Sequence, residues 1–459
     1  MTTATALAPR VDPDLPARLE RSASAVAAGH GMRTADFADW FAERTRAHRF
    51  RVERIPLAEL DGWSFSPGTG NLTHRSGRFF TVEGLRAAGD EGLGTWEQPI
   101  IHQPEIGILG VLAKEFDGVL HFLMQAKMEP GNPGLVQLSP TVQATRSNYT
   151  RAHRGAGVRY VEHFTRPGRG RVLVDVLQSE HGAWFHRKSN RNVIVEAAGD
   201  VPAHEDFCWL TLGQIGELLR RDAVVNMDSR SVLACAPLPD HEPGALHSDT
   251  DVLSWLTTER SRREVRARLV PLAGLAGWER SASAVEHVSG RSFRVVAVRA
   301  AAGNREVPGW TQPLVEPAAA GVVAFVLRRF GGVPHLLARA RAEGGLADAV
   351  ELGPTVQHVP DGVVGVDADP PAFLDLVLGA GPERIRYSAV HSEEGGRFLN
   401  AVSRHLIVEA GPEEAPEEAP PGHLWVTPGQ LTSLAGSGRY VNVQARTLLA
   451  AVSSRAAVL

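Results

Sequence analysis

Two short stretches concentrate side chains that could do chemistry. Lysine occurs at only three positions in this sequence, against 45 arginines, and one of them is Lys127 in LMQAKMEPGN. A second lysine, Lys188, stands in WFHRKSNRN between His186 and Asn190. If both stretches are strands, alternation places Gln125 beside Lys127 on one face, and the imidazole, amine and amide of the second stretch together on another. Lysine offers a compact ammonium charge where arginine offers a broad planar fork, so these positions are candidates for contact with a ligand.

The chain contains the same unit twice, which provides an internal comparison for these candidates. VERIPLAELDGW returns as ARLVPLAGLAGW, LSPTVQ as LGPTVQ, and VIVEA as LIVEA, always in the same order. The offset stays between 213 and 216 residues over seven matched blocks, which identifies an internal duplication. Polar residues found in both copies are expected to hold the fold, and those found in one copy are candidates for chemistry.

The candidates differ between the copies. Most of the polar side chains of the first copy are replaced in the second, by the pairs Gln125/Arg339, Lys127/Arg341, His181/Glu394, His186/Leu399, Lys188/Ala401 and Asn190/Ser403. After the shared TVQ, the first copy also has Arg146, Asn148 and Tyr149, where the second has no aromatic hydroxyl. Glu129 and Glu180 recur as Glu343 and Glu393, which favours a structural role, although duplication could also preserve an ancestral site.

Each candidate also has a structural interpretation. His186, Lys188 and Asn190 could form a polar strand edge that discourages aggregation, but their collective loss from the second copy favours a ligand site. Lys127 fits either interpretation, because Arg341 keeps the charge. The recurring Trp63, like its counterpart in the second copy, is expected to anchor the core.

Mixed periodicity predicts the elements that position these residues. A helix is predicted from Asp36, and another after a Thr211 cap in TLGQIGELLRRD. Between them, the runs IGILGVLA, VLHFLMQAKME, RVLVDVLQSE and NVIVEA have the composition of strands. We therefore expect an α+β fold in which a mixed sheet is packed with helices and used twice. The predicted organisation is an N-terminal extension (1–35), a first repeat (36–235), a linker (236–248) and a second repeat (249–459).

Composition limits the class of protein. A formal charge of -4 over 459 residues, without a basic tract, gives no electrostatic reason to expect nucleic acid or an anionic membrane as partner. Two cysteines suit a reducing compartment, and no uncharged apolar run of membrane-spanning length occurs, so we expect a cytoplasmic protein. GxxxxGK, GxGxxG, HExxH and CxxC motifs are all missing, which leaves a nucleotide-dependent redox enzyme or a zinc site unsupported.

The doubled unit, SGRFFTVEG, LMQAKMEPGN, LSPTVQATRSNY and FHRKSNR together resemble the NDP-hexose 2,3-dehydratases of deoxysugar biosynthesis, over roughly residues 36–450. The resemblance implies tandem Nudix-like domains, a homodimer, and dTDP-4-keto-6-deoxy-D-glucose as substrate, which loses its C2 hydroxyl to give a 3,4-diketo-2,6-dideoxy sugar for a downstream ketoreductase. Neither repeat contains the Nudix box whose glutamates bind metal, so no metal is expected. No cofactor is expected either, because the C4 ketone of the substrate accepts the electrons.

This implied chemistry needs a base at C3, a cation or donor at the enolate oxygen, and an acid for the departing hydroxyl. The hypothesis assigns roles by side-chain chemistry. The acid–base candidates are Tyr149, Glu180 and His181. The cations for the enolate or diphosphate are Lys127 and Lys188, the further diphosphate candidates are Arg146, Arg187 and Arg191, and the groups that could orient the sugar are Gln125, Asn148, His186 and Asn190. The first repeat is predicted to catalyse and the second to serve as a scaffold.

Three other functions stay open at this level. A metal-dependent nucleotide-sugar hydrolase is disfavoured by the missing box. A binding or scaffold protein would hold a nucleotide sugar without changing it. An epimerase acting on the same ketosugar would share the first proton abstraction, and only loss of the C2 oxygen separates it from a dehydratase.

Overall fold

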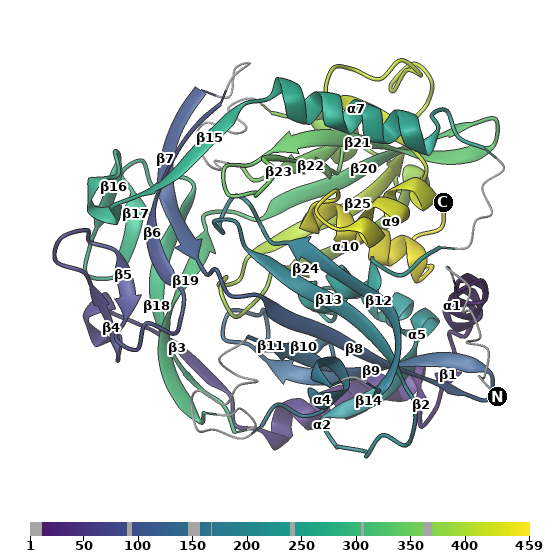
Figure 1. Cartoon of the computed structure of the whole chain (residues 1–459), viewed down its shortest axis with the longest axis horizontal. Coiled ribbons are helices and arrows are strands. Elements are labelled where there is room, and N and C mark those ends of the chain that lie inside the picture. The colour runs from purple at the N-terminus through teal and green to yellow at the C-terminus, as the bar shows by residue number, and fades with distance from the viewer. Residues whose placement is uncertain are drawn as a thin grey trace, which may run out of the picture.

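From α2 in the first half and α7 in the second, the two halves of the chain have nearly the same succession of elements (Figure 1). The computed structural model describes residues 12–89, 94–145, 157–166, 168–238, 244–303, 307–360 and 370–459. The elements of the first half are α1 (Leu15–Ser24), β1 (Ala28–Gly29), β2 (Met32–Arg33), η1 (Thr34–Asp36), α2 (Phe37–Ala47), β3 (Arg51–Ile55), η2 (Leu57–Glu59), β4 (Trp63–Phe65), β5 (Leu72–His74), β6 (Thr81–Gly89), β7 (Gly94–His102), β8 (Gly107–Phe116), β9 (Val119–Met128), β10 (Val136–Ser139), β11 (Val142–Ala144), α4 (Glu162–Thr165), β12 (Gly170–Ser179), β13 (Ser189–Ala197), β14 (Phe207–Thr211), α5 (Leu212–Leu219) and α6 (Met227–Leu233).

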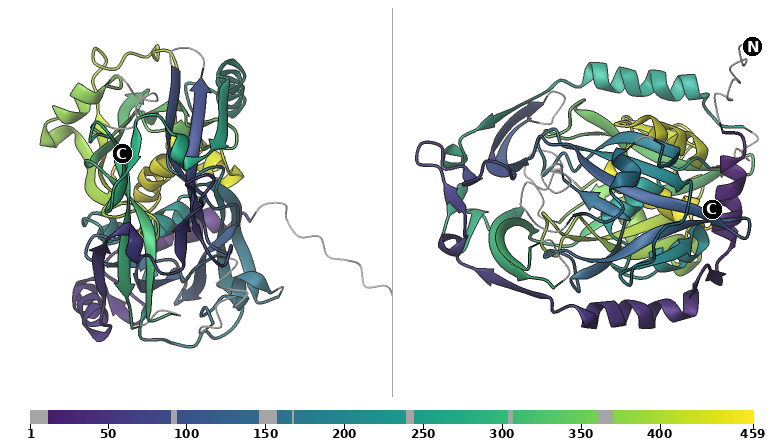
Figure 2. Two further views of the ribbon diagram at one scale, coloured as in Figure 1. Left: turned by 90° about the vertical axis from the view of Figure 1, so that its left-hand side faces the viewer. Right: turned by 60° about the horizontal axis from the view of Figure 1, so that its bottom comes forward.

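The second half repeats this order from a longer opening helix. Its elements are α7 (Asp249–Arg262), β15 (Val265–Val270), η3 (Leu272–Gly274), β16 (Trp278–Arg280), β17 (Ala284–His287), β18 (Phe293–Ala301), β19 (Gly309–Pro317), β20 (Gly321–Phe330), β21 (Val333–Ala342), β22 (Val350–Gly353), β23 (Val356–His358), α8 (Leu374–Leu378), η4 (Pro382–Arg384), β24 (Ile385–Ser392), β25 (Val402–Glu409), β26 (His423–Val426), α9 (Pro428–Ser437) and α10 (Val443–Ser453). In the right-hand view of Figure 2, the corresponding helices α2 and α7 lie on opposite sides of the molecule.

Each half builds one large mixed sheet. The first large sheet has the order β10-β9-β8-β13-β12, with β11 on β8 and β14 on β9, and the second large sheet has the order β22-β21-β20-β25-β24, with β23 and β26 in the same places. One pair in each sheet is parallel, β13 with β8 and β25 with β20, and the other pairs are antiparallel. The expected mixed α+β architecture, used twice, is therefore confirmed.

The halves share a core and exchange strands. One cluster of buried side chains joins Phe122 and Ile215 of the first half to Phe325 and Leu448 of the second. Beside the large sheets lie two small sheets, one containing β4–β7 and the other β16–β19 (Figure 1). The first small sheet takes β15 from the second half, and the second small sheet takes β3 from the first. Each half therefore completes a sheet of the other.

The recurring tryptophans strengthen this exchange. The indole N–H of Trp63 donates to the carbonyl of Thr311 at 3.1 Å, and that of Trp278 donates to the carbonyl of Glu97 at 2.9 Å. Each ring is packed in the core cluster between the two small sheets, and each N–H reaches a strand of the other half. The anchoring role expected from their recurrence is what their contacts provide.

The predicted helix starts lie where the sequence places them, with one difference in mechanism. Thr211 caps α5 through a reciprocal pair of hydrogen bonds with Gln214, as a Thr cap should. Asp36 precedes α2, but its carboxylate binds Arg33 at 2.6 Å and makes no cap bond. The Asp36 carboxylate binds the Arg33 guanidinium in place of the backbone N–H groups of the helix.

Two fully buried arginines hold the halves together reciprocally. Arg230 on α6 donates from Nη2 to the carbonyl of Ser392 at 2.6 Å, and Arg446 on α10 donates from Nη2 to the carbonyl of Ser179 at 2.6 Å. Their Nε atoms bind Thr447 and Ser231, again in the opposite half. Arg230 therefore fixes the end of β24 in the second half, and Arg446 fixes the end of β12 in the first half.

Replacing Arg446 with methionine is expected to lower the free energy of unfolding by roughly 3–5 kcal/mol, because the carbonyl and hydroxyl acceptors around it would stay buried without a donor. Urea unfolding followed by tryptophan fluorescence would measure this change. Arg404→Met is the control, since Arg404 is exposed and should change stability by less than about 0.5 kcal/mol. Equal decreases in the free energy of unfolding for the two variants would contradict the role of Arg446 in holding the halves together.

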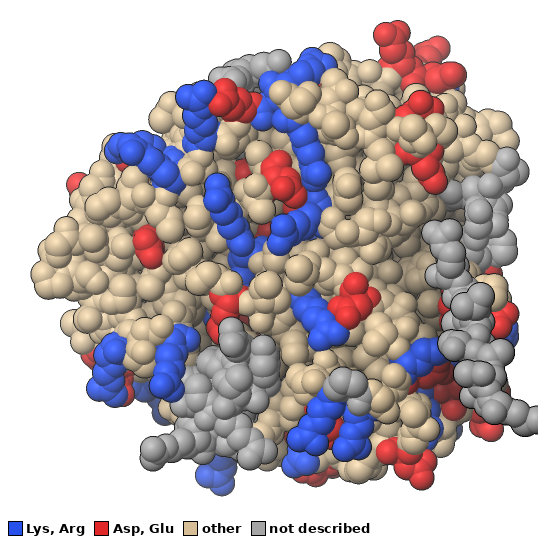
Figure 3. Space-filling view, viewed as in Figure 1, with Lys and Arg blue, Asp and Glu red and all other residues tan. Residues whose placement is uncertain are grey.

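Charges of both signs are mixed on one face of the molecule. On the face shown in Figure 3, described lysines and arginines alternate with described acids, and neither sign occupies a broad area. In the part of the chain that the structure describes, no helix is both long and apolar enough to span a membrane.

Candidate active site

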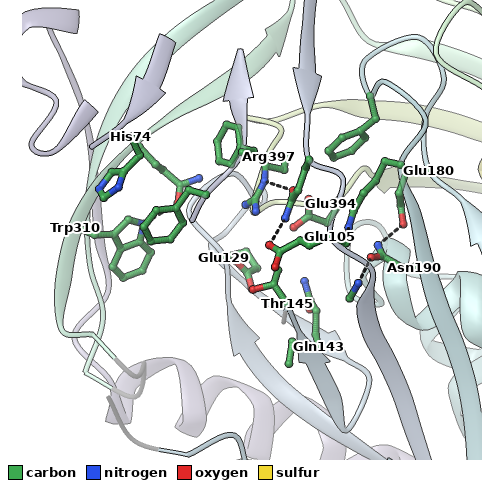
Figure 4. Close-up of a pocket in the computed structure, with 18 of the residues that line it drawn as sticks. His74, Glu105, Glu129, Gln143, Thr145, Glu180, Asn190, Trp310, Glu394 and Arg397 are labelled. Atoms are coloured by element: carbon green, nitrogen blue, oxygen red, sulfur yellow. Dashed lines mark hydrogen bonds between the residues drawn. The ribbon is translucent and has the colours of Figure 1, made fainter. Parts of the chain in front are cut away.

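A cavity of about 350 Å³, here called the first cavity, opens between the first large sheet and the two small sheets (Figure 4). Its inner wall carries charged side chains, and its mouth carries aromatic rings that include Phe79 and Trp310. This volume is within the range of small-molecule sites. The charged residues of the wall are Glu105, Lys127, Glu129, Glu180, Lys188, Asp228, Glu394 and Arg397.

Lys127 is near the end of β9, where alternation turns it toward the first cavity. Its ammonium lies 3.2 Å from Glu129 and donates to the carbonyl of Gln143 at 3.1 Å. Both charged side chains are buried, so each compensates the other in a region where a lone charge would be costly. Lys127 therefore supplies positive charge among several carboxyl groups.

Glu180 follows β12 and is held with one oxygen available. Its Oε1 accepts a hydrogen bond from Asn190 at 2.7 Å, and Asn190 is itself fixed by the Gly107 N–H at 3.0 Å. The other oxygen, Oε2, is buried and has no hydrogen-bond partner among the described residues. A carboxylate oriented in this way can accept a proton from a substrate carbon.

Lys188 lies on the same wall and donates to the backbone carbonyl of Glu105. Burial lowers the pKa of Lys188 to about 8, although the nearby Glu180 opposes that shift. Lys188 is thus charged at neutral pH and loses its charge in mildly alkaline solution. An ammonium in such a site can stabilise a developing enolate oxygen.

Part of the first cavity comes from the second repeat. Trp310 and Gln312 reach its mouth from β19, and Glu394 and Arg397 reach its inner wall from the loop after β24. Arg397 donates to Gln103 at 3.1 Å, and its guanidinium lies 4.3 Å from the ring centre of Phe80. The cavity is therefore incomplete in either repeat alone.

A second, smaller cavity of about 100 Å³ occupies the corresponding place in the second repeat. Arg341 takes the position of Lys127 and binds Glu343 at 2.8 Å, and the recurring Glu393 binds His181 at 2.6 Å. Burial acts to lower the pKa of His181, but the Glu393 carboxylate outweighs it and raises that pKa. His181 therefore lines the second cavity, whereas Lys127, Glu180 and Lys188 line the first.

The structure brings some predicted site residues together and separates others. Lys127, Glu180, Lys188 and Asn190 all line the first cavity, whereas Gln125, His181, His186, Arg187 and Arg191 do not. The remaining predicted residues, Arg146, Asn148 and Tyr149, lie outside the described residues.

The separations have local reasons. β13 begins only at Ser189, and Arg187 has a φ of +50°. The prediction that residues 186–190 are all extended is therefore wrong for the residues that precede Ser189. His186 instead lies near His102, with ring centres 5.6 Å apart. Arg191 is paired with Asp175 at 2.7 Å on the outer face of β13, and Arg187 is exposed.

Asp228 and Glu394 are among the acids of the first cavity that the prediction does not include. Asp228, buried on the first turn of α6, corresponds to Gln444 in the matched endings NMDSRSVLA and NVQARTLLA, so the comparison of copies contains the signal for it. Glu394 is in the second copy and belongs to the first cavity, which no comparison of aligned positions can indicate. Burial, followed by repulsion from Glu394, raises the pKa of Asp228 well above its usual value.

The first cavity therefore combines a carboxylate with an available oxygen, an ammonium and several carboxyl groups. Among the residues that the structure describes, no group of three or more His, Cys, Asp or Glu side chains is arranged to hold a metal ion. The arrangement suits proton transfer at carbon and stabilisation of the anion that results. These features define a duplicated α+β protein with an acid–base site.

Comparison with known proteins identifies the family. The family model described as NDP-hexose 2,3-dehydratase matches residues 34–236 and again residues 249–452. A relative from Amycolatopsis orientalis is 57% identical over 99% of this chain and 97% of its own length. Relatives from Streptomyces violaceoruber (50% identical, 91% of this chain and 97% of the relative) and Saccharopolyspora spinosa (47% identical, 94% of each) are also similar. All three are named dTDP-4-dehydro-6-deoxy-alpha-D-glucopyranose 2,3-dehydratase. The chain belongs to the NDP-hexose 2,3-dehydratase family.

Proposed function

We propose that this protein is a hydro-lyase that removes water across C2 and C3 of dTDP-4-keto-6-deoxy-D-glucose, giving a dTDP-3,4-diketo-2,6-dideoxyhexose. Family membership and the names of the three relatives support the substrate and the reaction. The observation that carries the proposal is the meeting of Glu180 and Lys188 on one wall of the first cavity. A base and a cation side by side are what an enolate-forming elimination requires.

The reaction can be followed through these residues. The available oxygen of Glu180 takes the proton from C3, which the C4 ketone has made acidic, and the C3 electrons move to form an enolate on O4. The ammonium of Lys188 stabilises this oxygen. The enolate then reforms the ketone, the C2–C3 double bond forms, and the C2 hydroxyl departs as water with a proton from an acid. Ketonisation of the resulting enol places a proton on C2.

The nucleotide end of the substrate is assigned to the mouth of the first cavity. Phe79 and Trp310 offer apolar rings on which a thymine can stack. Arg75 also lines the mouth, and its guanidinium lies 3.9 Å from Asp61, too far for a hydrogen bond. We assign it to the diphosphate, in place of Arg187 and Arg191.

The finer structural assignments are proposals as well. We assign residues 36–235 and 249–459 to two Nudix-like domains, of which the first catalyses and the second supports it, and we propose a homodimer. The second cavity has less than a third of the volume of the first and has an arginine in place of Lys127, which favours this division of roles. Both cysteines are free and buried, in keeping with a cytoplasmic enzyme whose product passes to a ketoreductase.

The test is to incubate the protein with dTDP-4-keto-6-deoxyglucose in deuterated water, without added metal. The sugar is followed by proton NMR and by mass spectrometry after reductive trapping. Loss of one water with one deuterium at C2 is the expected result. Exchange at C3 or C5 without loss of water would indicate an epimerase, release of a nucleotide monophosphate would indicate a hydrolase, and binding without change would indicate a binding protein.

Activity is expected to fall as the pH rises through about 8. Burial lowers the pKa of Lys188 to about 8, so the ammonium is present below this pH and is lost above it. The measurement is the pH dependence of kcat/KM between pH 6 and 10. Lys188→Arg keeps the charge at all these values, so this variant, although slower, should lack the component near pH 8. A component near pH 8 that persists in Lys188→Arg would contradict the assignment.

A further inference from the structure

The departing hydroxyl needs an acid, and the second repeat places a carboxyl group in the first cavity. Glu394 comes from the loop between β24 and β25, yet it lines the first cavity (Figure 4). Its Oε1 accepts a hydrogen bond from the N–H of Gly396 at 3.0 Å. The side chain is only partly buried, so some of its surface faces the cavity.

The backbone fixes the position of Glu394 against the first repeat. The N–H of Gly131, in the turn after β9, donates to the carbonyl of Gly395 at 2.7 Å, and the N–H of Asn400 donates to the carbonyl of Gly131 at 2.8 Å. A Cβ on Gly131 would lie 1.8 Å from the carbonyl oxygen of Phe398, so only glycine permits this approach. The EPGN turn, residues 129–132, therefore binds and positions the loop that carries Glu394.

The pseudosymmetric position shows which groups Glu394 faces. His181 corresponds to Glu394, and in the second cavity its ring contacts both Glu393, at 2.6 Å, and Gln444, at 2.7 Å. The counterparts of these two partners in the first cavity are Glu180 and Asp228. Glu394 accordingly stands between the available carboxylate and a buried acid on α6.

The surroundings favour a proton on Glu394. Burial raises its pKa to about 7; Arg397 opposes the shift, and Glu129 and Glu180 add to it. Four other carboxyl groups share the wall with it, and so many negative charges cannot all be carried in one small cavity. The charged groups that share the inner wall with Glu394 are Glu105, Lys127, Glu129, Glu180, Lys188, Asp228 and Arg397.

We propose, on the basis of the dehydratase function proposed above, that Glu394 is the catalytic acid that protonates the departing C2 hydroxyl. In this step the O4 enolate reforms the C4 ketone, its electron pair forms the C2–C3 double bond, and the C2–O bond breaks. The Glu394 proton goes to the oxygen, so that water leaves and a carboxylate remains. That carboxylate then accepts the O3 proton, while C2 receives a proton from the Glu180 carboxyl group after this group has exchanged with solvent, which restores both groups.

The assignment gives the second repeat a direct part in the reaction of the first. The second repeat contributes the acid, and the first contributes the base. A first repeat produced alone would lack both Glu394 and the strand β15 that completes its small sheet.

The test separates proton abstraction from loss of the hydroxyl. Glu394→Gln can keep the hydrogen bond from Gly396 but cannot donate a proton to the leaving group as an acid does. It should lose water at least about 10²-fold more slowly than the native protein, while C3 of the substrate still exchanges with deuterated solvent at a rate within a few fold of the native rate. The control is Glu393→Gln, the same change at the preceding residue. Glu393 faces the second cavity, so this variant should keep both rates in the folded protein.

A substrate analogue with fluorine at C2 provides the second readout. Fluoride needs less assistance from an acid than hydroxide does, so Glu394→Gln should eliminate fluoride from dTDP-4-keto-2-fluoro-2,6-dideoxyglucose at close to the native rate. The variant should also lose the component near pH 7 from the pH profile. Glu394→Asp, which keeps the carboxyl group, should retain more water loss than Glu394→Gln.

The outcomes are distinct from those that test the function itself. If the native protein does not release water, the dehydratase assignment has failed before Glu394 is examined. If the native protein does release water, the role of Glu394 is overturned by a native rate in Glu394→Gln, by loss of C3 exchange together with water loss in the folded variant, or by failure of the fluoro substrate to restore turnover.

Discussion

Replacing Glu180 with glutamine is expected to lower kcat for dehydration by roughly 10³-fold or more, the range expected when a general base is removed. Glutamine has nearly the same shape and can still accept the hydrogen bond from Asn190, so the local structure should persist. The group facing the substrate becomes an amide, which cannot take a proton from C3. Water loss and C3 exchange should therefore both disappear, in contrast to Glu394→Gln, and both can be followed by proton NMR in deuterated water.

Glu393→Gln is the matched control, because Glu393 occupies the corresponding position in the second repeat. The control loses the pairing with His181 and some stability with it, so rates must be normalised to the folded fraction. After that correction, Glu393→Gln should remain within a few fold of the native rate. A comparable loss in both variants, or a Glu180→Gln variant that still exchanges C3, would contradict the assignment of the base.

Replacing Lys188 with alanine is expected to lower kcat by roughly 10²- to 10³-fold, the effect expected when a donor to a developing oxyanion is lost. The buried ammonium is the charge assigned to O4, and water entering the space could not replace it. KM should change much less than kcat, since the enolate exists only along the reaction path. Steady-state kinetics with the 4-ketosugar, measured below pH 7.5, would give both constants.

Arg404→Ala removes a cation from the exposed face of β25 and should leave kcat within about twofold of the native value. The comparison separates a local role of Lys188 from a general effect of positive charge. Equal losses in the two variants would refute the placement of the enolate. A large rise in KM with an unchanged kcat in Lys188→Ala would assign the amine to binding of the diphosphate instead.

Much of the fold can be predicted from the sequence because the local signals agree with one another. The strands with alternating or continuous apolar residues, such as 119–128 and 189–197, appear within a few residues of their predicted positions. The duplication also predicts that whatever one half builds, the other repeats. The exchange of β3 and β15 leaves no such signal, since a strand that pairs within its own half and one that pairs across halves have the same periodicity.

The candidate site, like the fold, can be predicted from the sequence only in part. Lys127, Lys188 and Asn190 differ from their counterparts in the second copy, and comparison of the copies singles them out. The same comparison places His181 with them, because it assumes that each copy supplies its own cavity. The turns at Gly131 and Gly345 instead bind loops of the opposite half, and Glu394 of the loop after β24 lies in the first cavity while His181 of the loop after β12 lies in the second. Only the three-dimensional arrangement assigns Glu394 to the first cavity and His181 to the second.

The most direct test of the central claim is a crystal structure of Glu180→Gln with dTDP-4-keto-6-deoxyglucose bound. In the predicted complex the sugar ring occupies the first cavity, with C3 facing residue 180, the C4 ketone near Lys188 and the C2 hydroxyl near Glu394, while the thymine lies at the aromatic mouth. A sugar bound only in the second cavity, or one whose C2 and C3 face the mouth of the first, would contradict the proposed site.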